Sequence, residues 1–371
     1  MTVLTPELLD RIRSRAPGYD RDNAFFAEDL DELRAVGYLA PRSLRETVRD
    51  QRLLAAHAPA TALGINMHLV TVGIARVLRD RGDDSLAWLL ADAEAGELFG
   101  FGNSEAGNDL VMFDSCTAAV PRADGSYAFT GTKIFTSLSP AWTRLGIFGR
   151  DDSDPGNPRL VHGFLDRAAG GHEAVGDWDV LGMRATQSFA TRLEGAVVPA
   201  DRIARVLPVG PSADLYIFGL FGNFLLLISS VYAGIADRAL ELGVAAVKER
   251  KSMKSGAAYS QDPDMRWQLA DAAIALDSLA PQIEGLARDL DELADRGSAW
   301  FRQLAGTKTR AVDVSRSVVE TAIRVSGGSA YSSANELSRL YRDALAGLLH
   351  PADPESAHST VATNLLGALE P

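Results

Sequence analysis

Three neighbouring residues combine side chains that suit the binding of a conjugated ring. Phe135 offers an aromatic face, and the hydroxyls of Thr136 and Ser137 follow it directly. Hydroxyl groups donate and accept hydrogen bonds without titrating near neutral pH. They can therefore hold the nitrogens and carbonyls of a redox cofactor while an aromatic ring covers it. The same three residues could also simply be the polar end of a strand.

Two histidines and a pair of glycines are further candidates for chemistry. An imidazole titrates near neutral pH, so His350 and His68 could donate or accept a proton. The plain alternatives are a capping residue before Pro351 and a packed core residue on an apolar helix. The pair Gly327-Gly328 would let backbone N–H groups approach a diphosphate closely, although such a pair is more often only a turn.

The composition of the 371-residue chain narrows the classes of partner. A formal charge of −12 and a pI near 5.0 would repel phosphate backbones, so we expect no nucleic acid partner. Cys116 is the only cysteine, which excludes an intrachain disulfide and a thiolate metal cluster, and we expect no metal site. A reducing, cytoplasmic setting fits that cysteine usage. The N-terminal residues lack the basic start and apolar stretch of a signal peptide.

One segment is long and apolar enough to cross a membrane. Leu215 to Ala236 contains no charged residue, which meets the roughly 20 residues that a spanning helix needs. Gly219, Gly222 and Asn223 interrupt the segment, and no belt of basic and aromatic residues flanks both of its ends. We therefore expect a buried bundle helix and no membrane partner.

The pattern of apolar and polar residues changes twice along the chain. Residues 1–98 are rich in leucine and alanine at helical spacing, as in residues 26–36. Residues 99–205 consist of short alternating runs separated by turns such as Asp124-Gly125, which is typical of strands. Long helices rich in alanine, leucine and valine return in residues 206–371. This pattern predicts an α+β chain with helices, then a β-domain, then helices.

Four motifs resemble those of the acyl-CoA dehydrogenase superfamily, and they occur in that family's order. The most specific is the Gly-x-Lys-x-Phe-Thr-Ser stretch of residues 131–137, which in the family leads onto a flavin ring. The resemblance implies an N-terminal helical domain, a middle antiparallel β-barrel-like domain and a C-terminal four-helix bundle. The other three motifs are Asn103 to Asp109, Leu181 to Ser188 with Val197-Val198-Pro199, and Gly327 to Tyr331 with Arg339, Tyr341, Arg342, Asp343 and Ala344.

The resemblance also implies a flavin cofactor shared between subunits. FAD is the family's cofactor, and FMN is the other flavin that such a site would hold. Arg250 stands where the family has an arginine that reaches the diphosphate of a neighbouring subunit's cofactor, although Met253 and Lys254 replace the usual Phe and Gly. A homodimer or homotetramer follows from the same resemblance. The implied cofactor-binding residues are Asn103, Glu105, Phe135, Thr136, Ser137, Arg250, Gly327 and Gly328.

The substrate side departs from the family pattern. An acyl-CoA dehydrogenase needs a carboxylate to remove the α-proton of its substrate while the flavin accepts the β-hydride. Most members carry that glutamate seven residues after the Ala of Arg-Asp-Ala, where this chain has Pro351. Others carry it on the long central helix, but residues 218–224 contain no acid and the nearest is Asp214. The family's glycine-rich N-terminal loop is also missing from residues 40–46.

One branch of the superfamily matches these departures. Its flavin-dependent monooxygenases lack the glutamate and carry a histidine just after the Arg-Asp/Asn-Ala segment, where His350 stands. The resemblance therefore implies that His350, with His68 as a second candidate, acts in the oxidation of a small organic substrate. A separate flavin reductase would supply reduced flavin, because the chain has no Gly-x-Gly-x-x-Gly nicotinamide fingerprint. Two alternatives stay open: an acyl-CoA or acyl-carrier-protein dehydrogenase with a relocated base, and a non-catalytic flavin-binding relative.

Overall fold

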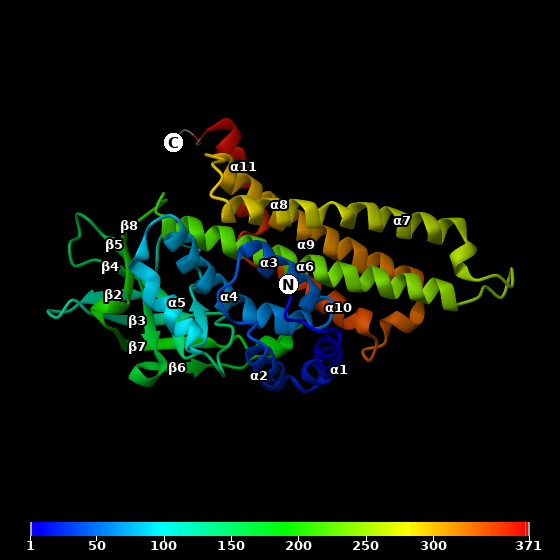
Figure 1. Ribbon diagram of the computed structural model, residues 1–371, viewed down its shortest axis with the longest axis horizontal. Helices are drawn as coiled ribbons and strands as arrows, with labels where there is room; N and C mark the ends of the chain where they lie inside the picture. Colours follow the sequence, from blue (N-terminus) through cyan, green and yellow to red (C-terminus); the bar gives the residue numbers. More distant parts are fainter. Residues whose placement is uncertain (1, 111, 368, 370–371) are drawn as a thin grey trace.

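The computed structural model describes residues 2–110, 112–367 and 369, and it places a β-domain between two sets of helices (Figure 1). The strands gather at one end of the molecule, and the long C-terminal helices extend away from them. The predicted fold is confirmed. The N-terminal helices are α1 (Pro6–Asp22), α2 (Ala27–Ala35), α3 (Leu44–Ala55), α4 (Pro59–Asp80) and α5 (Ala87–Glu94).

The strands in the described residues form one sheet that is mainly antiparallel. Their order is β6-β7-β3-β2-β4-β5-β8, and β1 pairs with β4 off this path. The pairings of β4 with β1 and β2 are parallel. The strand β8 crosses the domain boundary that the sequence places after residue 205. The strands are β1 (Phe99–Gly102), β2 (Ala118–Pro121), β3 (Tyr127–Lys133), β4 (Arg144–Asp151), β5 (Arg159–Asp166), β6 (His172–Val175), β7 (Ala190–Val198) and β8 (Ile203–Pro208).

The helix α6 (Leu215–Glu249) runs from the sheet to the far end of the molecule (Figure 1). It begins at Asp214, which accepts a hydrogen bond from the Tyr216 amide and pairs with Arg205 of β8 over 3.1 Å. Its 35 residues span roughly 52 Å at about 1.5 Å per residue. The other C-terminal helices are α7 (Pro263–Asp277), α8 (Leu279–Asp291), α9 (Ala299–Ser326), α10 (Glu336–Leu345) and α11 (Pro354–Leu366).

Two helices, α4 and α6, are long and apolar enough to cross a membrane by length and composition alone. In each helix the most apolar stretch is packed inside the molecule, with 94% of that stretch buried in α4 and 83% in α6. Packing in the interior therefore accounts for the apolar composition of both helices, as the sequence predicts for α6.

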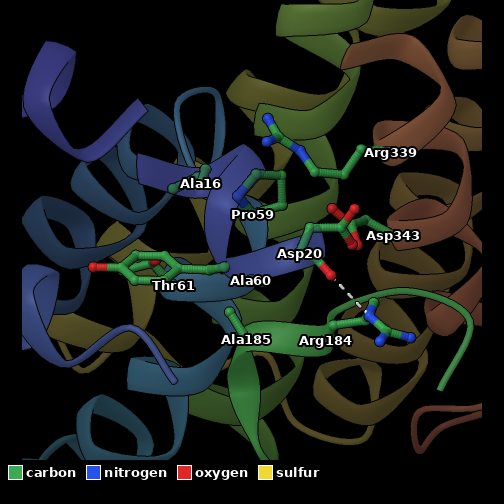
Figure 2. Close-up of a pocket in the computed structure, with 11 residues that line it drawn as sticks. Ala16, Asp20, Pro59, Ala60, Thr61, Arg184, Ala185, Arg339 and Asp343 are labelled. Atoms are coloured by element: carbon green, nitrogen blue, oxygen red, sulfur yellow. Dashed lines mark hydrogen bonds between the residues drawn. The ribbon is translucent and has the colours of Figure 1, made fainter. Parts of the chain in front are cut away.

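The motif of Leu181 to Ser188 and the motif that contains Arg342 and Asp343 meet at a joint between the β-domain and α10. Gly182 lies so close to this helix that a Cβ atom there would stand 2.3 Å from the carbonyl oxygen of Arg342. The Asp343 carboxylate accepts a hydrogen bond from the Met183 amide (2.5 Å), and burial raises its pKa to about 6. Figure 2 shows Asp343 and Arg184 beside the small pocket at this joint. These two motifs therefore help to hold the parts of the fold together.

Candidate functional site

A buried ion pair holds the acidic loop against strand β3. Lys133, the last residue of β3, donates to Glu105 Oε1 over 2.6 Å, and both side chains are buried. The same carboxylate accepts hydrogen bonds from the hydroxyls of Ser115 and Thr117 and from the Cys116 amide. Burial opposes ionisation of Glu105, but Lys133 and these hydrogen bonds outweigh it and lower its pKa to about 2. The carboxylate is thus used within the β-domain, and a contact with the cofactor stays a prediction.

The chain turns sharply after β3 and presents residues 135–138, which we call the ring turn. Phe135 and Leu138 adopt φ values of 56° and 64°, in the left-handed region that such side chains rarely occupy. The Phe135 side chain is 57% exposed, and its ring lies edge-on to Trp178 with centroids 6.2 Å apart. Thr136 Oγ1 is buried and has no hydrogen-bond partner in the described part of the chain. An unpaired buried hydroxyl next to an exposed aromatic face indicates a site for a polar ring.

A line of hydroxyls runs inward from the ring turn. Ser137 Oγ lies 2.8 Å from Ser188 Oγ, which in turn donates to Thr186 Oγ1 over 2.8 Å. Ser188 and Thr186 belong to the motif of Leu181 to Ser188, so the ring turn and this motif line the same place. Sequence reasoning did not single out either hydroxyl as a site residue.

An aromatic pair stands beside the ring turn on the side of the central helix. Phe224 of α6 stacks on Phe101 of β1, with ring centroids 6.4 Å apart and planes 20° apart. The next residue, Gly102, lies beside the ring turn, and a Cβ atom there would stand 3.5 Å from Thr136 Oγ1, an ordinary contact distance. Asn103 follows and is buried, and its predicted contact with the cofactor stays a prediction. An apolar wall, rather than an acid, therefore faces this place from α6.

Arg250 and the glycine pair also meet, but at the opposite end of α6. Arg250 Nη1 donates to the carbonyl oxygens of Val325 (3.0 Å) and Ser326 (2.6 Å), at the C-terminal end of α9. A Cβ atom on Gly327 would stand 2.9 Å from that nitrogen, whereas the space around Gly328 is open. Along α6, roughly 39 Å at about 1.5 Å per residue separate Arg250 from Phe224, which contacts the β-domain. One chain cannot bring both groups to the same flavin ring.

His350 lies in the loop after α10, where it contacts the central helix. Its Nδ1 is 3.1 Å from the hydroxyl of Tyr232. Burial, followed by the nearby ammonium of Lys308, lowers the pKa of His350 to about 3. The buried Lys308 Nζ anchors the same loop by donating to three carbonyl oxygens, those of Gly347 (2.9 Å), His350 (2.7 Å) and Ala352 (2.6 Å).

His68 has a different environment, because both of its ring nitrogens already have backbone partners. The ring is fully buried on α4. Its Nε2 is 2.9 Å from the Leu39 carbonyl oxygen, and its Nδ1 accepts from the Phe99 amide over 3.2 Å. Burial lowers its pKa to about 4. The geometry gives His68 a structural role between α4 and β1, and the predicted catalytic role stays untested.

Comparison with known proteins supports the resemblance to the acyl-CoA dehydrogenase superfamily. Residues 226–352 match the family model described as acyl-CoA dehydrogenase, C-terminal domain. The chain is also 24% identical to the putative acyl-CoA dehydrogenase YdbM of Bacillus subtilis, over 93% of this chain and 91% of that protein. The chain is thus similar to an acyl-CoA dehydrogenase over nearly its whole length, and its residues 226–352 match the C-terminal domain of that family. The resemblance carried by the four motifs is thereby confirmed.

Two further proteins that the chain resembles are not named as dehydrogenases. The chain is 28% identical over 239 residues to the amino sugar nitrososynthase DnmZ of Streptomyces peucetius, which is 63% of this chain but only 58% of that enzyme. The solved complex of TdsC from Paenibacillus sp. A11-2, a dibenzothiophene monooxygenase, with FMN and indole has a TM-score of 0.82 at 21% identity. That match covers 98% of this chain and 96% of TdsC, and it shows the shared fold.

Three residues that contact the predicted site residues carried no recognisable signal in the sequence. Trp178 lies in an irregular segment, and Tyr232 lies in an apolar run of the central helix. Lys308 resembles an ordinary charged residue on an amphipathic helix. Only the contacts of each residue, with Phe135 and with the loop of His350, identify its place in the site.

Proposed function

We propose that this chain is a flavin-dependent monooxygenase, which uses reduced flavin to oxidise a small organic molecule. The observation that carries the proposal is the lack of a carboxylate at both places where the superfamily puts its base. On α6, Phe224 packs against Phe101, and the loop after α10 has His350 followed by Pro351. Without a base, the α-proton of an acyl thioester has no acceptor. TdsC is named a monooxygenase and DnmZ a nitrososynthase, and these names support an oxygenation rather than a dehydrogenation.

The residues of the ring turn fit a flavin. The unpaired Thr136 Oγ1 and the hydroxyl of Ser137 can hydrogen-bond the polar edge of its ring, and the exposed Phe135 can cover a face. FAD or FMN, once bound and reduced, would supply the electrons for the reaction with oxygen. The FMN in the TdsC complex supports a flavin at this fold's site. A separate reductase would deliver the reduced flavin.

In this proposal, His350 holds a proton at a defined atom. Burial raises the pKa of Tyr232 well above its usual range, so its hydroxyl stays protonated and donates to Nδ1 of His350. The imidazole proton is then on Nε2, for which the described residues provide no partner. Because its pKa is about 3, the ring is neutral at physiological pH. Nε2–H can donate a hydrogen bond to the substrate or to the oxygen that is transferred.

An FAD site would need two copies of the chain. The ring turn lies beside Phe224, and Arg250 with Gly327-Gly328 lies roughly 39 Å further along α6, at about 1.5 Å per residue. The ring turn of one copy would hold the flavin ring, and Arg250 of the other would face the diphosphate. FMN lacks the adenylate half of FAD and has less to gain from Arg250. A homodimer or homotetramer is therefore part of the proposal.

Arg250→Ala is expected to weaken FAD binding by about 10- to 100-fold, because a hydrogen bond to a charged group contributes about 1.5–3 kcal/mol. The affinity for FMN should change much less. Flavin titration followed by fluorescence measures both affinities, with Arg288→Ala on the exposed side of α8 as the control. If FAD affinity is unchanged in a protein that still elutes as an oligomer, the shared site is wrong.

Butyryl-CoA is not expected to bleach the oxidised flavin of the loaded protein in the absence of oxygen. The reason is the missing carboxylate, since hydride transfer to flavin requires removal of the α-proton. Visible absorbance under anaerobic conditions measures the reaction. Bleaching within seconds would favour the alternative, an acyl-CoA dehydrogenase whose base has moved elsewhere.

A further inference from the structure

The helix α7 carries apolar side chains on two opposite faces. Its inner face contributes Ala272 and Leu276 to the helical bundle, where both residues are buried. On its outer face, Trp267 is 78% exposed and Ile274 is 72% exposed. Figure 1 shows α7 on the outside of the C-terminal helices. A surface helix normally has one apolar stripe, so a second, uncovered stripe indicates a second packing partner.

The spacing of the residues on this outer face suits a second copy of the same helix. Trp267 and Ile274 are seven residues apart, which is two helical turns, and Ala270 lies between them on the same face. If two copies of α7 pack in opposite directions about a two-fold axis beside Ala270, Trp267 of one copy meets Ile274 of the other. The small side chain of Ala270 lets the two helices approach each other at the axis. The outer face is therefore complementary to itself.

The charged residues that flank the outer face fit the same arrangement. Arg266 and Asp277 are both exposed and lie on the same side of the stripe. Neither forms an ion pair within the described part of the chain, and Arg266 donates to the carbonyl oxygen of Ser260 (3.2 Å). When two copies pack in opposite directions, Arg266 of one copy comes beside Asp277 of the other, and the opposite charges attract. Asp271 lies near the axis on the other side of the stripe, where like charges meet and weaken the contact.

The position of α7 connects this face to the flavin site that two copies would share. The helix begins four residues after Tyr259, and the guanidinium carbon of Arg250 lies 4.9 Å from the centroid of the Tyr259 ring. The helix α6 carries the chain away from the sheet to Arg250, and α7 returns toward the sheet (Figure 1). Packing two copies of α7 in opposite directions therefore turns the Arg250 end of each copy toward the β-domain end of the other.

We propose that the outer face of α7, centred on Trp267 and Ile274, is the surface on which a second copy of this chain packs. This inference rests on the proposed function, which includes an oligomer, and it names the contact between the copies. The contact removes a tryptophan and an isoleucine of each copy from water. Because the two-fold axis repeats every contact, each side chain acts twice in the interface.

Sedimentation velocity of the full chain at about 1–100 µM measures the assembly. Trp267→Glu should raise the dissociation constant of the contact at least about 100-fold and halve the mass of the assembly, because a tryptophan that dominates an interface occurs twice in this one. Leu366→Glu, at an 85% exposed position on α11, is the matched control and should leave the assembly intact. Both positions are exposed, so both variants should keep the fold, which circular dichroism checks.

Reversal of the flanking charges tests the antiparallel arrangement. Arg266→Asp or Asp277→Arg alone should weaken the contact by about tenfold, because each brings like charges together twice, and the double variant should recover most of the loss. Asp271→Asn should tighten the contact. A native chain that stays monomeric, a Trp267→Glu protein that assembles like the native chain, or a double variant that assembles no better than the single variants would overturn the proposal.

These measurements need neither flavin nor oxygen. Failure of the oxygenation chemistry in a protein that still assembles through α7 would count only against the proposed reaction. Loss of the predicted contact in a protein that still oxygenates would count only against this surface.

Discussion

Replacing Lys133 by methionine is expected to lower the free energy of unfolding by about 3–5 kcal/mol, because it leaves the buried Glu105 carboxylate without its cation. Methionine keeps most of the volume of the lysine stem, so the change in packing is small. Chemical denaturation followed by circular dichroism measures the loss. Adding Glu105→Gln should recover part of it, because an amide does not need a cation as its partner.

The control for this variant is Arg192→Met in the same β-domain. Arg192 is 46% exposed and pairs with Glu173 at the surface, where an ion pair contributes less than about 1 kcal/mol. A fall in pH should also reduce the stabilisation that the buried pair of Glu105 and Lys133 contributes. The pKa of Glu105 is lowered from 4.5 to about 2 in the folded protein, so its stabilisation is complete above pH 4.5 and is lost as the pH falls toward 2. A Lys133→Met protein as stable as Arg192→Met would show that the pair does not support the fold.

Replacing Lys308 by methionine is expected to release the loop of His350 and to raise the pKa of that histidine from about 3 toward its ordinary 6.5. The substitution removes a nearby positive charge and leaves three loop carbonyls without their shared donor, so water can reach the ring. In the native protein the folded pKa lies below the unfolded one. Stability is therefore lost as the pH falls below 6.5, and the variant should lose less over that range.

An NMR titration of the imidazole signals measures the pKa of His350 in the protein without substrate. Tyr232→Phe is the companion variant, because it should free Nδ1 while Lys308 still holds the loop. Lys248→Met, on the exposed side of α6, is the matched control. A pKa that stays near 3 in Lys308→Met would mean that Lys308 does not position His350.

Two of the sequence motifs could predict the fold because each includes a glycine that the packing requires. A Cβ atom on Gly131 would stand 2.6 Å from Thr117 Oγ1, and one on Gly182 would stand 2.3 Å from the Arg342 carbonyl oxygen. No other residue fits such close approaches without a shift of the backbone. The motifs are therefore tied to contacts between parts of the fold, and they can be recognised without coordinates.

The residues to which the polar side chains are hydrogen-bonded or ion-paired could not be predicted from the sequence in the same way. The motif of Glu105 resembles a cofactor-binding loop, but its carboxylate is occupied by Lys133, which lies 28 residues away in sequence. Tyr232 and His350 are 118 residues apart, and nothing in either segment points to the other. Helical spacing indicates which face of α6 is buried, but it does not indicate which side chain lies across from it. Only the packed structure supplies that information.

We propose that the chain activates oxygen on reduced flavin rather than oxidising an acyl thioester. The most direct test is stopped-flow mixing of the protein, loaded with chemically reduced FAD or FMN, with oxygenated buffer. We predict that oxidised flavin returns in two phases, with a transient absorbing species between them, and that free reduced flavin under the same conditions shows no such species. Return in a single phase at the rate of free flavin would contradict the account.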